Sequence, residues 1–590
     1  MQIRKACRRA LGFGAALLFS AVIPAFSQTV NTTRQDAGSG DEVSLLKQQI
    51  AQQQKQIEAL QTAMNEMKAR LDGGTAAVRS SAPQAPSVGE VASTTPVIPR
   101  GLTKPENASA PLPAVSLAQP ATASPKPPAD EVSPLQIHLG SAYITPVGFM
   151  DFTSVWRSKN NGSGIGTNFA GIPYSPTTFQ DNLSEFRLSM QNSRIGFRVD
   201  ALVKGSHVIG YMESDYLGNN PGNVAVSSNS NTLRSRLYWV DVRKSKLEVL
   251  GGQTWSLVTP GRTGISPLPG DLFYTQNIDV NYQLGLAWGR IPELRVVFHP
   301  TKTVAIAGAL DSPEQYIGGS SGGSLIVLPA ALNTTYSSEL NNGGNTLAVP
   351  NVAPDVIAKV AFDPNKRVHF EVGGVERNFK VWNPPTNVLP GQAPSLTGKI
   401  FTATGGAGFV NANVEVYKGL RLVTNNFGGD GGGRYIFGQA PDLIAHADGS
   451  ISQVHSYSSV SGFEYTRKNW LFYGYYGGLY VQRNTAIDIT GKPIGYGCAC
   501  IPNNVNQNKS VQEGTLGFAD TIWKDAKWGA LTFMGQYSYL ERNPWFVSNI
   551  PAVPPALPTP APKGTSLNMV FLNLRYTLPG SAPTLGNPAK

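Results

Sequence analysis

The stretch ALTFMGQYSYLERN, Ala530–Asn543, largely alternates between apolar and polar side chains. Its large apolar residues on one parity are Leu531, Phe533, Tyr537 and Tyr539. The opposite parity carries Thr532, Gln536, Ser538 and Arg542. Because successive side chains of a β-strand point to opposite faces, this pattern predicts a strand with one apolar and one polar face.

Two further stretches also indicate strands with an apolar outer face. Strands expected near Asp355 and Val368 place these apolar side chains outward: Val356, Ala358, Val360, Phe362, Val368, Phe370 and Val372. The segment NWLFYGYYGGLYVQRN, Asn469–Asn484, has six aromatic residues among glycines. We expect these aromatics to lie against lipid and at its interface, where Tyr and Trp are favoured. The phase of that strand is ambiguous from the sequence.

Outside the N-terminal region the sequence predicts sixteen strands with alternating connections. The strands are expected to start near Gln136, Glu185, His207, Thr232, Leu247, Tyr282, Thr303, Asp355, Val368, Thr402, Leu420, His455, Asn469, Val511, Ala530 and Ser566. Tight turns such as KGSH, RKSK and KDAK alternate with long loops rich in Gly, Asn, Ser and Pro. Short turns at one end, long loops at the other and an even strand number are typical of an outer-membrane β-barrel.

The predicted fold class is therefore an all-β transmembrane protein, a 16-stranded antiparallel barrel over residues 135–579 with an N-terminal helical coiled coil. A barrel of this size encloses an aqueous lumen. A soluble β-sandwich or propeller is the alternative for any strand-rich chain. No blade-length repeat is visible, and a soluble protein would not expose so much apolar surface.

The N-terminal region has three parts. Residues 1–27 have four basic residues, an apolar core and Ala25-Phe26-Ser27, the pattern of a secretory signal peptide, and 28–42 form a short segment. Residues 43–72 have the heptad pattern of a coiled coil, with isoleucines that favour a trimer. Its predicted core is Val43, Leu46, Ile50, Gln53, Ile57, Leu60, Met64, Met67 and Leu71. The Pro-rich residues 73–134 predict a disordered linker, and 580–590 a C-terminal tail.

The charge and the short motifs exclude several functions. The formal net charge is +10, of which four charges belong to the signal peptide, and the remaining basic residues are scattered singly. Such scattering argues against nucleic acid as a partner. No serine in a recognisable nucleophile-elbow setting and no HExxH motif are found, so neither an enzyme, a cofactor nor a metal site is predicted. Cys498 and Cys500 are expected to form a small loop disulfide, with free thiols as the alternative.

Arginines on the predicted strands are the main candidates for function. They are Arg194, Arg198, Arg234, Arg236, Arg290, Arg295, Arg542 and Arg575, and Arg262 lies in a loop. A charge pointing into lipid at mid-depth costs about 2–4 kcal/mol, so these side chains should face the lumen. They either brace the wall by pairing with Asp200, Asp241, Glu293 and Glu371, or together favour anions.

The stretch GGQTWSLVTPGRTGISPLPGDLFYTQNIDVNYQLGLAWGRIPELRV, Gly251–Val296, resembles the DcaP-type trimeric outer-membrane porins, relatives of the phosphate-selective porin group. The resemblance extends to LRSRLYWVDV, to QNSRIGF at Gln191–Phe197 and to the coiled coil. It implies a homotrimer, a periplasmic coiled coil and passage of small anions such as dicarboxylates. It also implies that the third long loop folds inward and narrows the pore with Pro260, Arg262, Asp271 and Asp279.

The sequence thus predicts a passive diffusion porin embedded in outer-membrane lipid and lipopolysaccharide. A structural tether that reaches peptidoglycan through its stalk is the main alternative, and a barrel enzyme is a weaker one. A tether has no need of a constriction, so the loop at residues 260–280 distinguishes the first two hypotheses.

Overall fold

The structure is a computed structural model. It describes residues 134–140, 142–174, 178–218, 232–319, 323–342, 349–350, 353–385, 397–500, 507–547 and 563–579. The predicted signal peptide, short N-terminal segment, coiled coil, most of the linker and the C-terminal tail lie outside these residues.

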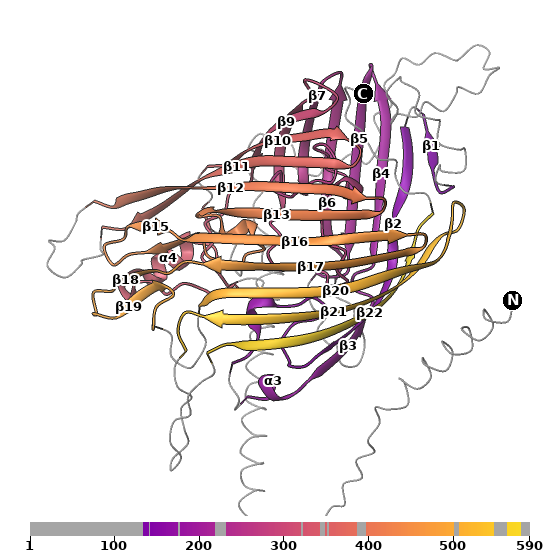
Figure 1. Ribbon diagram of the computed structural model, residues 1–590. Coiled ribbons are helices and arrows are strands. Elements are labelled where there is room, and N and C mark those ends of the chain that lie inside the picture. Colours follow the sequence, from indigo (N-terminus) through magenta and orange to yellow (C-terminus); the bar gives the residue numbers. More distant parts are fainter. Residues whose placement is uncertain are drawn as a thin grey trace, which may run out of the picture. The chain divides into compact units, whose positions relative to one another are not determined.

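Sixteen antiparallel strands close into one barrel, as predicted (Figure 1). Closure joins the first and last strands, with Phe152 opposite Leu574. The barrel strands are β2 (Ala142–Arg157), β3 with β4 (Glu185–Ser189 and Arg194–Val203), β5 (Ser206–Asp215), β6 (Arg234–Lys244), β7 (Leu247–Trp255), β8 (Arg290–Phe298), β9 (Val304–Asp311), β10 (Asp355–Asn365), β11 (Val368–Asn383), β12 (Lys399–Tyr417), β13 (Leu420–Asp430), β16 (His455–Arg467), β17 (Trp470–Val481), β20 (Asn508–Asp525), β21 (Gly529–Pro544) and β22 (Thr565–Thr577).

The second barrel strand is interrupted. Both β3 and β4 pair with β2, with Thr153 opposite Ser189 and Phe149 opposite Arg194. Between them the Asp151 backbone N–H donates a 2.9 Å hydrogen bond to Ser193 Oγ. The short β1 (Ile137–Leu139) pairs with β2 alone among the described strands. The two segments β3 and β4 therefore count as one barrel strand.

The connections alternate as the sequence predicts. One end of the barrel has tight turns, such as the one between β12 and β13, where Gly419 has a φ of 80° that suits glycine. The other end has the long loops. The strand expected to start near Tyr282 is wrong, because β8 begins at Arg290 and Tyr282 is buried in a loop.

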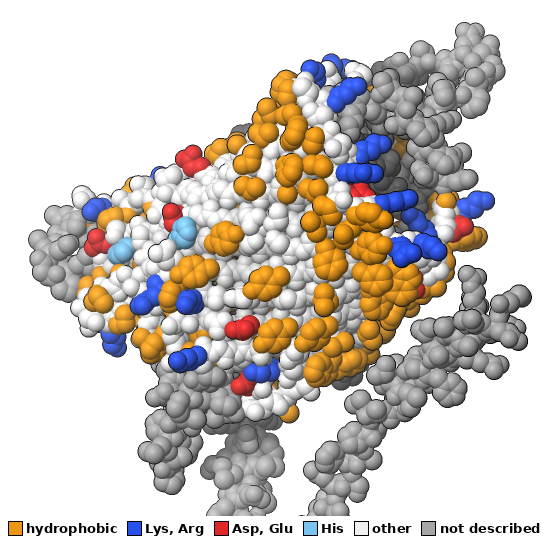
Figure 2. All heavy atoms as spheres, viewed as in Figure 1, with side chains coloured by type: hydrophobic (Ala, Val, Ile, Leu, Met, Phe, Trp, Pro, Cys, Tyr) orange, Lys and Arg blue, Asp and Glu red, His pale blue; other side chains and the backbone are white. Residues whose placement is uncertain are grey.

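The two faces of the wall differ in polarity. Val356, Phe370 and Val372 are exposed on the outer face, as predicted. Figure 2 shows hydrophobic side chains gathered in a band that crosses the strands. In β17 the prediction was partly wrong: Trp470 and Tyr476 are exposed, but Tyr473 and Tyr475 are buried on the inner side. An apolar outer band facing lipid is what a membrane barrel requires.

Small elements are inserted in the long loops. They are η3 (Phe169–Gly171), α3 (Phe179–Asn182), η4 (Pro269–Asp271), η5 (Ala330–Leu332), α4 (Asn333–Glu339), η6 (Gly433–Tyr435), and the hairpins β14–β15 (Leu443–Ala445 and Ile451–Gln453) and β18–β19 (Asn484–Ile487 and Pro493–Tyr496). None of the helices in the described part of the chain has the length and hydropathy needed to cross a membrane.

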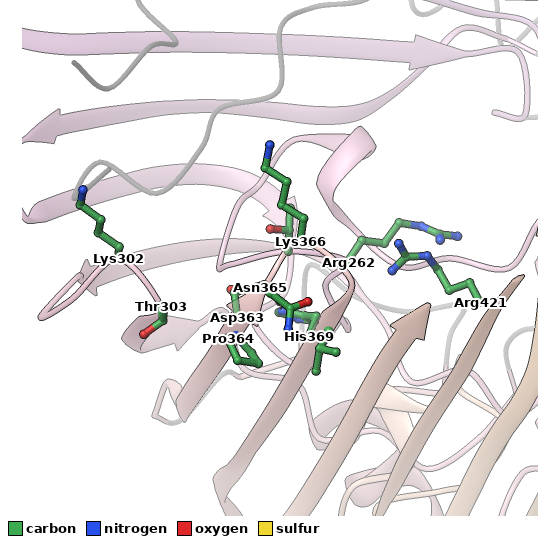
Figure 3. Close-up of a pocket in the computed structure, with 11 residues that line it drawn as sticks. Arg262, Lys302, Thr303, Asp363, Pro364, Asn365, Lys366, His369 and Arg421 are labelled. Atoms are coloured by element: carbon green, nitrogen blue, oxygen red, sulfur yellow. Dashed lines mark hydrogen bonds and ion pairs between the residues drawn. The ribbon is translucent and has the colours of Figure 1, made fainter. Parts of the chain in front are cut away.

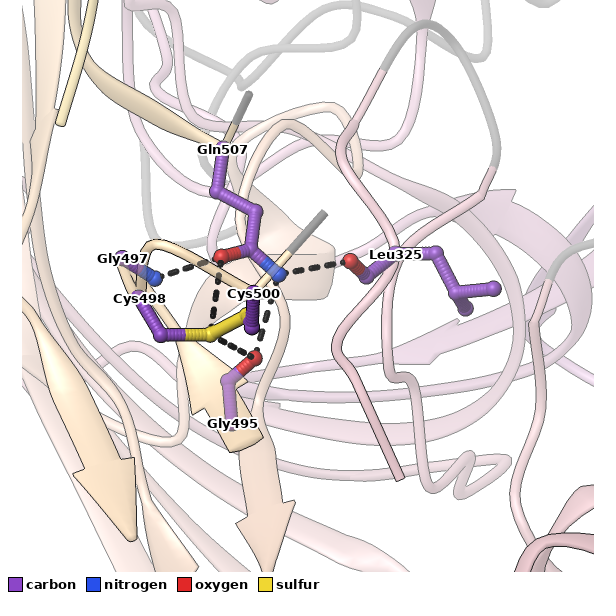
Figure 4. The surroundings of a disulfide bond; sticks show 6 residues. All are labelled: Leu325, Gly495, Gly497, Cys498, Cys500 and Gln507. Atoms are coloured by element: carbon purple, nitrogen blue, oxygen red, sulfur yellow. Dashed lines mark hydrogen bonds between the residues drawn. A yellow bond between two sulfur atoms is a disulfide. The ribbon is translucent and has the colours of Figure 1, made fainter. Parts of the chain in front are cut away.

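Cys498 and Cys500 form a disulfide just after β19 (Figure 4). Beside it, the Gln507 side chain accepts a 2.6 Å hydrogen bond from the Gly497 backbone N–H and donates one of 2.9 Å to the Leu325 carbonyl. This amide thus joins the β18–β19 loop to the loop that precedes β10.

Candidate functional site

The third long loop, residues 256–289, lies inside the barrel and is called the inward loop below. Its backbone N–H groups donate hydrogen bonds of 2.6–3.1 Å to side chains on five strands. The donor and acceptor residues are Gly261 and Glu371, Gln276 and Tyr475, Ile278 and Gln536, Leu284 and Glu513, and Ala287 and Asn425. Because these acceptors lie on β11, β17, β21, β20 and β13, the loop crosses the lumen.

The tip of the inward loop is a narrow double strand that reaches the short-turn end of the barrel. The Arg262 N–H donates to the Asp271 carbonyl at 2.7 Å, and the Phe273 N–H donates to the Pro260 carbonyl at 2.8 Å. The Gly264 N–H donates a 2.9 Å hydrogen bond to Asp363, which precedes the turn after β10. Three predicted constriction residues, Pro260, Arg262 and Asp271, therefore lie in this tip.

Charged and polar contacts fix the loop on both sides of its tip. Arg262 donates two hydrogen bonds of 2.8 Å to the Glu464 carboxylate, and the Tyr475 hydroxyl donates to the same carboxylate at 2.7 Å. The fourth predicted constriction residue, Asp279, accepts 3.2 Å hydrogen bonds from the Thr167 N–H of the first long loop. The inward loop is thus held by charge-assisted hydrogen bonds, which are the stronger class.

Three arginines, Arg194, Arg236 and Arg290, lie around Tyr282 of the inward loop, and Arg234 joins them through Asp215. This arginine–tyrosine cluster consists of Arg194, Arg234, Arg236, Arg290 and Tyr282, with Glu213 and Asp215 as its carboxylates. Arg236 contacts Glu213 at 2.7 Å and Asp215 at 2.8 Å, and its Nη2 lies 3.5 Å from the Tyr282 hydroxyl. Arg234 contacts Asp215 at 2.8 Å, and Arg194 lies 3.6 Å from Glu213. Four guanidinium groups against two carboxylates leave an excess of positive charge.

Arg290 is the least compensated member of the cluster. Its guanidinium carbon lies 5.4 Å from the Trp255 ring centroid and 5.1 Å from that of Trp288, which is cation–π geometry. Within the described residues, the buried Arg290 Nη1 has no hydrogen-bond partner, and neither has the buried Arg194 Nε. Buried donors without partners cost free energy, so this arrangement of the two arginines is energetically unfavourable by itself.

Tyr282 is held in an unusual conformation. Its φ is 64°, which is uncommon for a bulky residue and costs of order 1–3 kcal/mol. Burial by itself would raise the pKa of Tyr282, but the charges of Arg194, Arg236 and Arg290 lower it below the usual value. A tyrosine with a strained backbone conformation and positively charged neighbours is often found at functional sites.

Asp271 is the titratable group at the loop tip. Burial raises its pKa to about 6, against the opposing effects of Ser266, Arg243 and Arg198. A carboxyl with this pKa changes its charge close to neutral pH. The loop tip therefore carries a pH-sensitive charge between two wall arginines.

Comparison with known proteins bears on the fold. The chain matches no protein-family model and no curated protein. Among solved structures, the outer membrane channel DcaP of Acinetobacter baumannii is similar with a TM-score of 0.51 and 16% sequence identity, over 74% of this chain and 97% of that one. This chain has the fold of a 16-stranded outer-membrane porin.

Two other porin barrels align less well. The anion-selective porin from Comamonas acidovorans has a TM-score of 0.39 at 12% identity, over 74% of this chain and 99% of that one. OmpT of Vibrio cholerae has a TM-score of 0.39 at 10% identity, over 75% of this chain and 99% of that one.

The other predicted arginines line the inside of the porin barrel in separate places. Arg198 contacts Asp200 at 2.7 Å, Arg295 contacts Glu293 at 2.6 Å, and Arg575 contacts Asp151 at 2.7 Å. Arg542 donates a 2.7 Å hydrogen bond to the Ile172 carbonyl. Two carboxylates that were expected to pair with the predicted arginines pair with other residues: Asp241 contacts Arg243, and Glu371 contacts Lys359.

Sequence reasoning missed most of the cluster's other members. Glu213 and Asp215 have the same parity on β5, directly opposite Gly196 and Arg194 of β4. That parity was a usable signal for their inward orientation. Trp255 and Trp288 stand at the two ends of the inward loop, but no local pattern indicates that both rings contact Arg290.

Proposed function

We propose that this chain is an outer-membrane porin for passive diffusion of small hydrophilic solutes, with a preference for anions such as dicarboxylates. The observation that supports the proposal most is the excess of positive charge in the arginine–tyrosine cluster, placed where the inward loop crosses the lumen. Rings of arginine select for anions in other pores because they lower the electrostatic cost of entry.

The mechanism needs no chemical step. A carboxylate that enters the narrowed lumen loses water, and the excess positive charge of the arginine–tyrosine cluster offsets part of that cost. Tyr282 supplies a hydroxyl beside Arg236. Because Glu213 and Asp215 neutralise part of the charge, binding stays weak enough for release, which conduction requires.

The proposal includes the architecture implied by the family resemblance. Residues 1–27 would direct export, the short turns would face the periplasm, and three copies would assemble through the barrel wall and the coiled coil at residues 43–72. Lipid and lipopolysaccharide would contact the outer apolar band, and the coiled coil would lie near peptidoglycan. The pore would be lined by the nine predicted arginines.

A planar lipid bilayer tests the proposal. Mature protein purified from membranes is inserted under a potassium chloride gradient, and single-channel steps and the reversal potential are recorded. We expect closure in three equal steps, as for a trimer, and a reversal potential that favours chloride. Absence of any conductance from correctly folded protein would refute the porin function.

Shortening the inward loop separates a porin from a structural tether. Replacing residues 260–280 with a short Gly-Ser linker removes the loop tip and the anchor at Glu464. We expect the single-channel conductance to rise several-fold, because cross-section limits the current. The matched control shortens the exposed turn region at residues 489–492, outside the inward loop. An unchanged conductance after loop removal would favour the tether.

A further inference from the structure

A cavity of about 470 Å³ opens at the short-turn end of the barrel (Figure 3). It lies between the tip of the inward loop and the turns that follow β8 and β10. Its basic lining residues are Arg262, Arg421, Lys302 and Lys366. The volume is within the range of small-molecule sites. None of its residues belongs to the arginine–tyrosine cluster, so the cavity is a separate site.

The cavity has more positive charge than its carboxylates neutralise. Its single lining carboxylate, Asp363, already accepts hydrogen bonds from the Gly264 N–H at 2.9 Å and contacts His369 at 2.8 Å. Lys302 and Lys366 are exposed, and neither ammonium forms an ion pair within the described residues. Figure 3 shows the two lysine side chains extending in the same direction from neighbouring turns.

The two arginines of the cavity are partly compensated. Arg262 is bound by Glu464, whereas Arg421 donates a 2.6 Å hydrogen bond to Asn413 and lies 3.7 Å from Glu415. Their guanidinium groups point toward one another in Figure 3 and are close enough to repel. Like charges held together in this way are stabilised by an anion placed between them.

Neutral donors complete the lining. Thr263, Thr303 and Asn365, whose side chains carry hydroxyl and amide donors, also line the cavity. The Asn365 Oδ1 accepts a 2.9 Å hydrogen bond from the Arg367 N–H, which leaves its amide nitrogen as a donor for a ligand. Ammonium groups, guanidinium groups and hydroxyls together match an oxyanion with several acceptor oxygens.

We propose that this cavity binds a compact anion with two or more negative charges, a phosphate compound or a polycarboxylate, at the short-turn mouth of the channel. The inference deepens the proposed porin function and rests on it, because the anion would meet this site as it leaves or enters the lumen. A bound anion would also reduce the ionic current when it is supplied from the short-turn side.

Titration calorimetry on detergent-solubilised full-length protein tests the site directly. Diphosphate and citrate are the two probes, and the variant is K302Q/K366Q. The control K524Q/K527Q removes two exposed lysines near a different short turn, with the same change in net charge. We expect the dissociation constant of at least one probe to rise about tenfold or more in K302Q/K366Q and to remain unchanged in the control.

The calorimetric outcomes decide the inference. Tight binding of diphosphate alone identifies phosphate chemistry, tight binding of citrate alone identifies polycarboxylates, and binding of both supports recognition by charge number. No binding of either probe to wild-type protein overturns the inference. Equal weakening in the lysine variant and the control overturns it as well, because the effect would then be one of overall charge. Circular dichroism verifies that each variant retains its β-sheet.

A bilayer measurement adds a readout that distinguishes the two proposals. Each probe is added to one side and then to the other while chloride current is recorded. We expect block from one side only, with about tenfold weaker block in K302Q/K366Q. Symmetric block overturns the mouth site while leaving the porin function intact. If wild-type protein conducts no ions, the porin function fails, and calorimetry still decides whether the cavity binds anions.

Discussion

Arginines on the inner wall of the barrel occur in two kinds of surroundings. In the arginine–tyrosine cluster, four guanidinium groups share two carboxylates. Elsewhere several arginines each pair with one carboxylate, as in the pairs Arg198 with Asp200, Arg295 with Glu293 and Arg575 with Asp151. Apart from Arg290, which lies at the start of β8 with the parity opposite to that of Arg295, these arginines share the inward parity of their strands. Parity alone therefore does not distinguish a bracing residue from a solute-binding one. The local ratio of arginines to carboxylates does distinguish the two roles.

The largest expected effect is a loss of stability in a variant that breaks one of these ion pairs. In R198Q, Asp200 remains as a largely buried carboxylate without its 2.7 Å partner. Breaking a buried ion pair in this way typically costs about 3 kcal/mol or more of unfolding free energy. Urea unfolding in micelles, followed by tryptophan fluorescence, measures the loss.

The double variant R198Q/D200N is the matched control for that measurement. It removes both charges, so most of the lost stability should return. If R198Q alone is as stable as wild type, the bracing interpretation of the paired arginines is wrong.

The next effect is expected in the cluster. R290Q removes a positive charge that leaves no carboxylate unpaired, since Asp215 keeps Arg234 and Arg236. We expect the chloride-to-potassium permeability ratio to fall about fivefold, equivalent to about 1 kcal/mol. Stability should change by only about 1 kcal/mol, the scale of the lost cation–π contacts. Reversal potentials measure the ratio, and a fall no greater than in R575Q would remove the distinction between the two groups.

A smaller change in anion preference, and one of opposite sign, is expected for E213Q. This variant removes one of the two cluster carboxylates and increases the local positive excess. We expect anion preference to rise about threefold. The control is E376Q, at the outer parity of β11, where Glu376 is exposed on the wall. Equal permeability ratios in E213Q and wild type would show that the cluster does not face the ion path.

The smallest expected change in anion preference is the one produced by a change of pH. As the pH falls through about 6, Asp271 takes up a proton, because burial raises its pKa above the usual value. The lumen then loses one negative charge near Arg243 and Arg198, so anion preference should increase about twofold between pH 7.5 and 5. Reversal potentials across this range measure the shift. D271N should show a high, flat profile, and an identical pH dependence in D271N would assign the titration to another group.

Most of the barrel could be predicted from the sequence because alternation and turn spacing are local signals. The strand predicted to start near Tyr282 is absent, and the reason is physical. Tyr282, Leu284, Leu286 and Trp288 alternate with less apolar residues as in a wall strand, yet the segment packs inside the lumen. Period-two alternation reports a two-sided environment, and a loop between the wall and the lumen has one as well.

The inward tyrosines of β17 show the second limit. Aromatic residues occur on both parities of this strand, so no phase could be chosen from the sequence. The Tyr475 hydroxyl is needed inside because it accepts the Gln276 N–H and donates to Glu464. Those partners are distant in sequence, and single-sequence patterns contain no information about such contacts.

The anchors of the inward loop also constrain the order in which the barrel forms. Glu464, Tyr475, Glu513 and Gln536 all follow the loop in the chain, on strands that close the second half of the barrel. The loop cannot reach its final position until those strands have paired, so we expect its docking to be among the last steps of refolding. Pulsed proteolysis during refolding would detect it: cleavage within residues 260–280 should persist after the wall has become resistant. The channel would then exist first in a wider form, which narrows as the loop docks.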